Sequence, residues 1–483
     1  MFVVPLSQYD RDKPSDCRPS LQIRRIPLAE KVVTINIFLA LILIGAHSSS
    51  AEETAEAAAN ARLARTVIYL SSDELEGRGL GSKGLDLAAD YIAQQFHDIG
   101  LKTDLYDGTP FQKFTAPASS PHGAKPLDPA PLEPAAQARA SSAIGPANNT
   151  TTPPPAVEAK RIDAKNVVAV LEGQGPHAGE TIVIGAHYDH LGRGEPGTLE
   201  PGSHEIHHGA DDNASGVAAM LEIARQLAGR EEKLPRRIVF IAFTGEERGL
   251  FGSAHYVKDP LFPLDKTIAM LNLDMVGRLT DDKLIVYGDG TAAQWDNLLD
   301  RLNEKHAFQI TRHSEGFGPS DHSSFYAKQI PVLFFFTGTH KQYHRPSDTF
   351  DTINVDGMRR VADFVADAAI AIAESDDRPT YKEVAGGSQF AKSGDRPYFG
   401  SIPDFSQDQP GYALMGVSKG GPAETAGIQG GDIILKLGDY PIANLDDFDT
   451  ALRKFKSGDR VTVLLKRGND ELKFAVTLQP PRQ

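Results

Sequence analysis

The chain has almost no cysteine. Its one cysteine, Cys17, lies near the start of a sequence of 483 residues, in a segment that we interpret below as a removable leader. The remainder therefore offers neither a disulfide nor a thiolate ligand. Any metal site in the folded protein must be built from histidine and carboxylate side chains.

Excess positive charge is also missing. The net charge is −14, with 40% hydrophobic and 24% charged residues, which is the balance of a soluble globular protein. We expect no nucleic-acid partner, because no stretch is basic enough to neutralise a phosphate backbone. The acidity favours solubility but identifies no partner. The length predicts two or more domains.

Residues 32–46 form an apolar run that is shorter than the roughly 20 residues of a membrane-spanning helix. Basic residues precede it, and the small residues Ser49-Ser-Ala51 follow it. This pattern predicts a secretory signal peptide over residues 1–51 and hence a secreted or periplasmic protein. The alternative is an uncleaved leader that anchors the chain in the membrane.

Strands and helices alternate along most of the chain. Apolar runs of strand length begin near residues 166, 181, 237, 268, 283 and 332, and helical patterns begin near 214, 292 and 355. This alternation predicts an α/β fold, a three-layer α/β/α sandwich with a mostly parallel mixed sheet. Further helices are expected between residues 52 and 101. Residues 115–160 hold ten prolines and twelve alanines, which predicts a disordered insertion.

Acidic and imidazole side chains follow the ends of the predicted strands or precede a predicted helix. They are His187, Asp189, Asp211, Asp212, Glu246, Glu247, Asp274 and His344. Because ligands of open α/β sheets bind beyond the carboxyl ends of the strands, we expect these residues to converge at one edge. A carboxylate at a helix N-terminus also stays ionised, as a metal ligand must be.

Five short motifs resemble those of the M28 family of co-catalytic zinc peptidases, in the order and spacing of that family. They are His187-Tyr-Asp189, Gly209-Ala-Asp-Asp212-Asn-Ala-Ser-Gly216, Gly245-Glu246-Glu247, Leu273-Asp274 and Tyr343-His344-Arg-Pro-Ser-Asp348-Thr. The resemblance covers roughly residues 60–375 and implies a peptidase domain over residues 52–375.

The resemblance implies a centre of two Zn²⁺ ions. Asp212 would bridge them, His187 and Asp274 would complete one site, and Glu247 and His344 would complete the other. Nitrogen and oxygen ligands of this kind would also accept Co²⁺ or Mn²⁺.

The same resemblance implies roles around the metals. Glu246 would act as the general base, and Asp189 would accept the second ring N–H of His187. Tyr343, Asp321 and His322 would contact the substrate. Asp211 is a neighbour to which no role is given. His190, His207 and His208 are interpreted as loop residues or as residues that support the ligands without binding the metal.

The expected activity is that of an aminopeptidase that releases N-terminal residues. The alternatives are another M28-type hydrolase, such as a carboxypeptidase or dipeptidase, a glutaminyl-cyclase-like enzyme, or an inactive binding protein. The family often inserts a protease-associated domain where residues 115–160 lie, and its absence argues against the carboxypeptidase-like members. A full set of five ligands favours a hydrolytic metal pair.

The C-terminal part predicts a separate module. Residues 376–397 are polar and are interpreted as a linker. Residues 398–483 resemble a small β-rich PDZ domain of the bacterial protease type, through Tyr398-Phe-Gly-Ser-Ile and the glycine-rich stretch that begins at Gly416. The resemblance implies capture of a C-terminal peptide beside a strand edge. The expected partners are thus a peptide or protein substrate and a C-terminal peptide ligand, with a membrane only if the leader is uncleaved.

Overall fold

The computed structural model describes residues 53–117, 161–194, 197–200, 202–384, 397–403, 410–418, 420–443 and 445–480. The predicted leader, most of the Pro/Ala-rich insertion and residues 385–396 of the linker lie outside these ranges. Within the described residues, no helix has the length and apolar character needed to cross a bilayer.

The N-terminal part contains one eight-stranded sheet with the order β1-β2-β4-β3-β5-β8-β6-β7. The four central strands β4, β3, β5 and β8 pair in parallel, and β6 and β7 are also parallel. The mostly parallel mixed sheet is therefore confirmed. The strands are β1 (Phe111–Pro117), β2 (Arg161–Leu171), β3 (Thr181–His187), β4 (Arg237–Phe243), β5 (Thr267–Leu273), β6 (Lys283–Tyr287), β7 (Gln309–His313) and β8 (Val332–Phe336).

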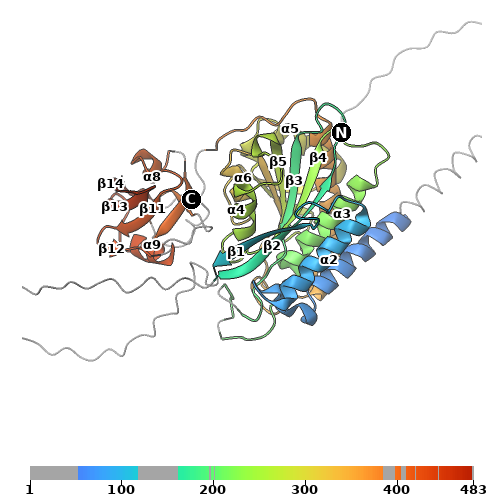
Figure 1. Ribbon diagram of the computed structural model, residues 1–483, viewed down its shortest axis with the longest axis horizontal. Helices are drawn as coiled ribbons and strands as arrows, with labels where there is room; N and C mark the ends of the chain where they lie inside the picture. Colours follow the sequence, from blue (N-terminus) through green and yellow to red (C-terminus); the bar gives the residue numbers. More distant parts are fainter. Residues whose placement is uncertain are drawn as a thin grey trace, which may run out of the picture. The chain divides into compact units, whose positions relative to one another are not determined.

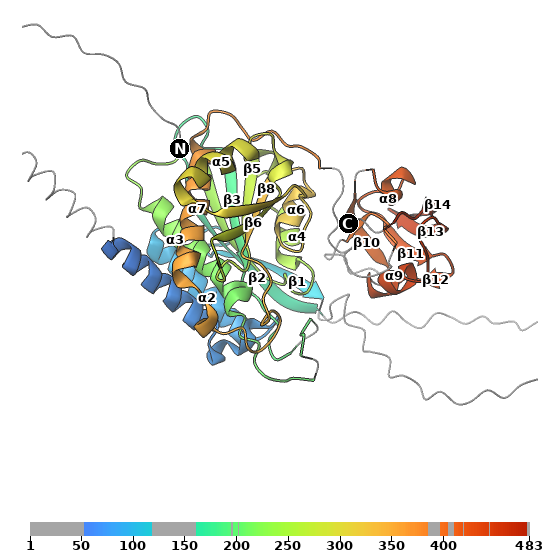
Figure 2. The same ribbon diagram turned by 180° about the vertical axis from the view of Figure 1, so that it is seen from behind.

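Both faces of this sheet are covered by helices (Figures 1 and 2). Along β4, side chains alternate between two hydrophobic clusters, with Phe240 on one face and Ile241 on the other. This is the period of two that a strand buried on both sides requires. One face packs against a helix over residues 53–70, α2 (Lys83–Ile99), α3 (Gly216–Ala228), α5 (Trp295–His306) and α7 (Val355–Glu374), and the other against α4 (Phe251–Lys258) and α6 (His322–Tyr326).

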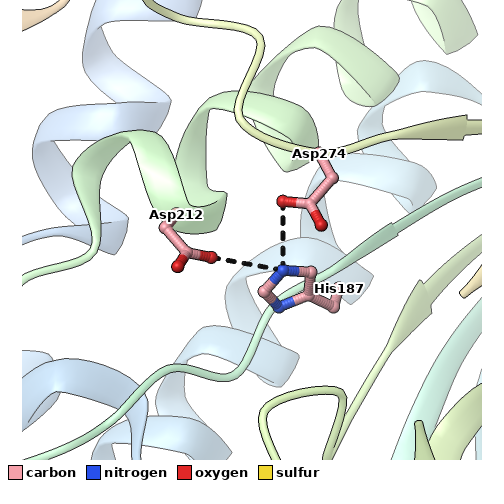
Figure 3. A group of neighbouring side chains, drawn as sticks. All are labelled: His187, Asp212 and Asp274. Carbon is pink, nitrogen blue, oxygen red and sulfur yellow. Dashed lines mark hydrogen bonds and ion pairs between the residues drawn. The ribbon is translucent and has the colours of Figure 1, made fainter. Parts of the chain in front are cut away.

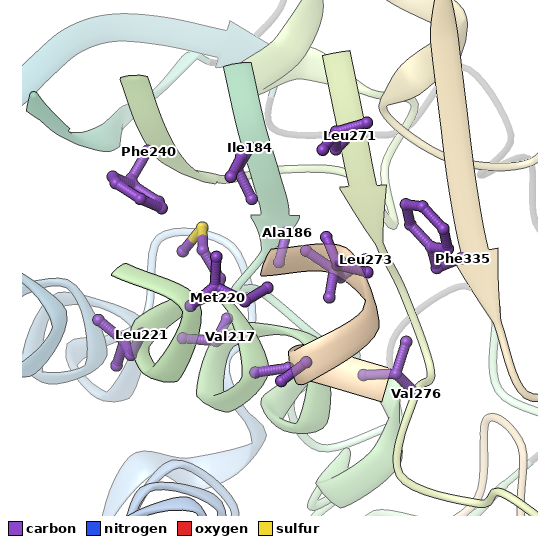
Figure 4. Packing of buried hydrophobic residues seen from close by; sticks show 14 of the residues in the cluster. Ile184, Ala186, Val217, Met220, Leu221, Phe240, Leu271, Leu273, Val276 and Phe335 are labelled. Carbon is purple, nitrogen blue, oxygen red and sulfur yellow. The ribbon is translucent and has the colours of Figure 1, made fainter. Parts of the chain in front are cut away.

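The larger cluster holds α3 against the end of the sheet that carries the candidate site (Figure 4). Val217 and Met220 of α3 are buried with Ile184 of β3 and Leu271 of β5. Each fully buried side chain of this kind stabilises the fold by about 1.5–3 kcal/mol. This packing fixes the start of α3 beside the ends of β3 and β5.

The structure extends two of the predicted boundaries. Residues 115–117 belong to β1, which pairs antiparallel with β2, and are not part of the insertion. After α7, the backbone N–H groups of Lys382 and Val384 donate to the Thr291 carbonyl and the Tyr326 hydroxyl, each at 2.8 Å. The first part of the predicted linker thus belongs to the N-terminal domain, which continues to Val384.

The C-terminal part forms its own antiparallel sheet with the order β14-β13-β11-β10-β9, and β12 pairs with β11. Its core is a separate cluster that includes Phe399, Ile434 and Val463, which confirms a small β-rich domain. The elements are β9 (Ser401–Pro403), β10 (Tyr412–Val417), α8 (Pro422–Thr425), β11 (Ile433–Leu437), β12 (Tyr440–Pro441), α9 (Leu445–Leu452), β13 (Arg460–Arg467) and β14 (Asp470–Thr477).

Candidate metal centre

The five predicted metal ligands converge at the carboxyl ends of the central parallel strands. His187 is the last residue of β3, and Asp274 directly follows β5. Glu247 and His344 lie in the loops after β4 and β8. Asp212 lies in the turn before α3, with non-helical backbone angles (φ −103°, ψ 92°). Neighbouring parallel strands end at the same edge, so residues distant in the sequence meet there.

The first group of ligands is His187, Asp212 and Asp274 (Figure 3). The Nε2 atom of His187 lies 3.3 Å from Asp212 Oδ1 and 3.3 Å from Asp274 Oδ1. The Nδ1–H of the same ring donates to the Asp189 carbonyl at 3.2 Å. That bond fixes the tautomer in which the Nε2 lone pair of a neutral ring faces the carboxylates.

The second group shares Asp212 with the first. Asp212 Oδ2 lies 3.2 Å from His344 Nε2, and Glu247 Oε2 lies 3.1 Å from the same nitrogen. His344 Nδ1 donates to the Gly197 carbonyl at 2.9 Å, so its Nε2 is again the free coordinating atom. The two oxygens of Asp212 therefore face two different histidines.

Asp189 supports the candidate ligands, as predicted, but its carboxylate makes different hydrogen bonds from the one predicted. Its carboxylate Oδ1 lies 3.8 Å from His187 Nδ1, too far for a hydrogen bond. It instead accepts the backbone N–H of Glu246 at 3.1 Å and of Glu247 at 3.4 Å. The Asp189 carboxylate thus holds the loop after β4, while its backbone carbonyl orients His187.

His190 lies in the loop after β3 and supports a candidate ligand, in line with its interpretation from the sequence. Its Nδ1 donates to Glu247 Oε1 at 2.7 Å and lies 3.7 Å from Asp212 Oδ2. The ring is fully buried, whereas His344 lines the adjoining cavity. The donor atoms of His190, Asp212 and Glu247 lie within 4.8 Å of one another, so His190 could also complete this second group. We keep His344 as the proposed ligand because its Nε2 faces the carboxylates of both Asp212 and Glu247, whereas His190 Nδ1 is hydrogen-bonded to Glu247. The position of His190 three residues after His187, in the same strand-end loop, was the signal in the sequence.

Two buried acids hold the backbone around Asp212. Asp348 Oδ2 accepts the N–H groups of Asp211 and Asp212 at 2.9 and 3.0 Å. Asp211 Oδ1 accepts the N–H of Gly277 at 2.7 Å, in the loop that follows Asp274. The carboxylate of Asp211 also lies 3.1 Å from His340 Nε2, in the loop that carries His344. Asp211 therefore connects three ligand-bearing segments.

Comparisons with known proteins agree with this arrangement. A model of peptidase family M28 matches residues 166–369, and a PDZ-domain model matches residues 397–478. An uncharacterized protein of Escherichia coli, YfbL, is 31% identical over 237 residues, which cover 42% of this chain and 69% of that protein. The chain belongs to peptidase family M28.

Other relatives match over a shorter part of their own length. Aminopeptidase YwaD of Bacillus subtilis is 28% identical over 228 residues, covering 45% of this chain and 46% of that protein. The chain spans about half the length of most of the curated relatives that it matches. Among solved structures, an aminopeptidase from Aneurinibacillus sp. strain AM-1 aligns with a TM-score of 0.46 and 22% identity, over 67% of this chain and 98% of that chain.

The charges of this M28 centre fit a pair of divalent cations. Burial would lower the pKa of His344, but the carboxylates of Glu247 and Asp212 outweigh it and raise that pKa to about 12. Burial likewise opposes the charge on His187, yet Asp274 and Glu246 raise its pKa well above the ordinary value. Without cations, protonated imidazoles neutralise the carboxylates. Three carboxylates and two Nε2 atoms form the donor set that two N/O-ligated metals need.

We expect metal binding to release protons. The raised pKa values of His187 and His344 keep both rings protonated at neutral pH, and a metal ion binds only the neutral ring. The apparent metal affinity should therefore rise with pH across the neutral range, with about one proton displaced per ion. Titration calorimetry in buffers of different ionisation enthalpy measures this number, and an observed heat that does not depend on the buffer would contradict it.

A cavity of about 250 Å³ opens onto the centre. Tyr343 lines it, and its ring stacks on His344 with 3.8 Å between the centroids. Asp321 and His322 are fully buried and are not among the residues that line it, contrary to the predicted substrate contacts. His322 stacks on Phe334, which lines the cavity, and burial lowers the pKa of His322 to about 3. His322 therefore supports the wall of the cavity through Phe334.

Proposed function

We propose that the chain is a binuclear zinc metallopeptidase, and that it acts as an aminopeptidase. The observation that supports the metal pair most directly is the orientation of the Asp212 carboxylate, whose Oδ1 faces His187 while its Oδ2 faces His344. A carboxylate shared in this way suits two cations about 3.5 Å apart. The nitrogen and oxygen donors suit zinc. Relatives named aminopeptidase or leucine aminopeptidase support the exopeptidase activity.

Glu246 is the proposed general base. When bound, the two ions would polarise the scissile carbonyl and lower the pKa of the attacking water. Glu246 lines the cavity, and its Oε2 lies 4.0 Å from His187 Nε2, beside the ligands but outside the two groups. Burial raises the pKa of its carboxyl well above the usual range. Glu246 takes the proton of the water and returns it to the leaving amine.

Tyr343 is the proposed donor to the substrate oxygen. It lines the cavity, and burial together with the nearby carboxylates raises its phenol pKa well above the ordinary value. The hydroxyl therefore keeps its proton at neutral pH. A neutral O–H that faces the substrate oxygen stabilises the oxyanion of the transition state more strongly than it stabilises the carbonyl of the ground state.

The cavity favours a short, apolar substrate end. Its volume of about 250 Å³ lies below the usual range of roughly 300–1,000 Å³ for ligand sites. Apart from the acidic and histidine side chains, the residues that line the cavity are mostly apolar or aromatic and include Met275, Tyr287, Pro319, Phe334 and Phe336. We infer a preference for an apolar side chain at the first substrate residue, since such a lining rewards its burial.

The C-terminal PDZ domain is proposed to bind a C-terminal peptide. Gly400 adopts a left-handed backbone conformation (φ 82°) directly before β9, where a Cβ would lie 3.3 Å from Pro422. The loop before an edge strand is where PDZ domains capture a terminal carboxylate. Such binding would deliver partners or substrates to the peptidase.

We also propose that the protein is exported, as secreted or periplasmic. The support is the basic, apolar and small-residue pattern of residues 1–51 alone. N-terminal sequencing of protein secreted by an expressing cell tests it, and a retained leader in a membrane fraction would favour the anchored alternative.

A panel of substrates tests the aminopeptidase assignment. We expect cleavage of leucyl and phenylalanyl substrates with a free amine, loss of cleavage on chelation, and its return with Zn²⁺. Lysyl and glutamyl substrates should be cleaved at least about 10-fold more slowly, since an apolar pocket discriminates by about 1–3 kcal/mol. Equal cleavage of N-blocked peptides would point to another M28-type hydrolase, and cyclisation of N-terminal glutamine to a glutaminyl-cyclase-like enzyme.

A further inference from the structure

A buried arginine in the segment 71–79 has no part in the chemistry above. Arg78 is fully buried, and four of its hydrogen bonds go to backbone carbonyls. One acceptor is Leu70, at the end of the first described helix. The others are Tyr188 at 2.8 Å, His208 at 2.8 Å and Gly209 at 2.9 Å.

The last three acceptors belong to the two segments that carry His187 and Asp212. Tyr188 lies between His187 and Asp189, and Gly209 lies three residues before Asp212. A guanidinium presents its donors in a rigid planar fork. Carbonyls bound to the two ends of that fork cannot move apart without breaking a charge-assisted hydrogen bond. Arg78 thus ties the end of β3 to the turn before α3.

The backbone around Arg78 makes the same connection. The N–H of His190 donates to the Arg78 carbonyl at 3.1 Å, and the N–H of Gly192 donates to the Gly77 carbonyl at 2.9 Å. Gly77 has a positive φ of 70°, and a Cβ there would lie 2.4 Å from the Gly192 carbonyl oxygen. Only glycine fits this close approach. The whole segment is therefore docked on the loop that follows His187.

The positive charge of Arg78 also interacts with the acidic side chains of the metal centre. Burial lowers its pKa to about 10, and the carboxylates of Asp212 and Asp189 oppose this shift. The group remains a cation at neutral pH. A buried charge persists only when hydrogen bonds or opposite charges compensate it, and here carbonyl dipoles and the acids of the site do so. Loss of the side chain would leave these carbonyls without their donor.

We infer that Arg78 is a positioning residue of the metal centre, which sets the separation of His187 from Asp212 by clamping the backbone beside each. The inference rests on the proposed metal pair, but it concerns metal affinity and not the reaction catalysed. Replacing a residue that orients metal ligands, without binding the metal itself, commonly lowers metal affinity by about 10–100-fold.

The chain contains a matched control in Arg236. This arginine is also fully buried, and it donates to the carbonyls of Ile372, Ala373 and Ser375 at the end of α7 and to Glu180. It contacts neither ligand-bearing segment through these bonds. Arg236→Met should lower the melting temperature as Arg78→Met does, without a specific effect on the metals.

The test measures Zn²⁺ dissociation constants of the purified full chain by competition with a chromophoric chelator, well below each melting temperature. We expect Arg78→Met to weaken Zn²⁺ binding by about 10–100-fold and Arg236→Met to change it by less than about 2-fold. Arg78→Lys keeps the charge without the fork, so it should recover only part of the loss. It also serves as the test variant if Arg78→Met does not fold.

Wild-type affinity in the Arg78 variant, or equal losses in the Arg78 and Arg236 variants, would overturn the inference. A wild-type chain that binds two Zn²⁺ ions but cleaves no peptide would refute the proposed activity and leave this comparison valid. A wild-type chain that binds no Zn²⁺ would refute both.

Discussion

Glu246→Gln is expected to lower kcat by at least about 10²-fold while two metal ions stay bound. The amide has the shape of the carboxylate but cannot accept the proton of the attacking water. Glu246 lies beside the ligand groups and not within them, since neither compact cluster of donor atoms includes it. Its backbone N–H bond to Asp189 does not involve the side chain and should persist. Metal analysis and steady-state kinetics on the same preparation measure both effects.

The neighbouring Glu247 provides the control. Glu247→Gln removes a carboxylate that lies 3.1 Å from His344 Nε2 and 2.7 Å from His190 Nδ1. This variant should lose one metal ion as well as activity. If Glu246→Gln lost a metal ion and Glu247→Gln kept both, the two roles would have to be exchanged.

Asp212→Asn is expected to weaken both metal sites together. The amide cannot offer an anionic oxygen to each group, so the cations lose their shared ligand. Replacing a residue that hydrogen-bonds to a metal ligand, without binding the metal itself, already lowers metal affinity by about 10–100-fold. Loss of a bridging ligand should lower it by more than about 10²-fold. Activity at ordinary metal concentrations should fall to background. Zinc content after gel filtration and activity at increasing Zn²⁺ measure the effect.

Asp211→Asn is the matched control for that variant. Asp211 is the adjacent acid and is equally buried, but its Oδ1 accepts the Gly277 N–H, a bond that an asparagine oxygen can still accept. We expect both metals to stay bound, with a smaller loss of stability. Loss of both metals from Asp211→Asn and retention in Asp212→Asn would reassign the bridging role.

The central strands could be predicted, and candidate ligands proposed at their ends, because each leaves a local pattern in the sequence. After Arg237, the strand is continuously apolar to Phe243, as a strand buried on both faces must be, and an acidic pair follows it. The edge strands leave no such pattern. Gln309–His313 is polar, and its five residues are all partly or fully exposed. It is a strand because it pairs with β6, which no local pattern reveals.

Interactions between side chains and distant backbone could not be predicted either. The direction of the Asp189 carboxylate depends on the N–H groups of Glu246 and Glu247, which come from the loop after β4. Arg78 lies in a polar turn, where an arginine is usually exposed. Its burial depends on carbonyls more than a hundred residues away, at Tyr188, His208 and Gly209.

A crystal of the full chain grown with Zn²⁺ and measured at the zinc absorption edge tests the central claim most directly. The account predicts two anomalous peaks about 3.5 Å apart on either side of the Asp212 carboxylate. One peak should adjoin His187 and Asp274, and the other Glu247 and His344. A single peak, or two peaks that do not share Asp212, would contradict it.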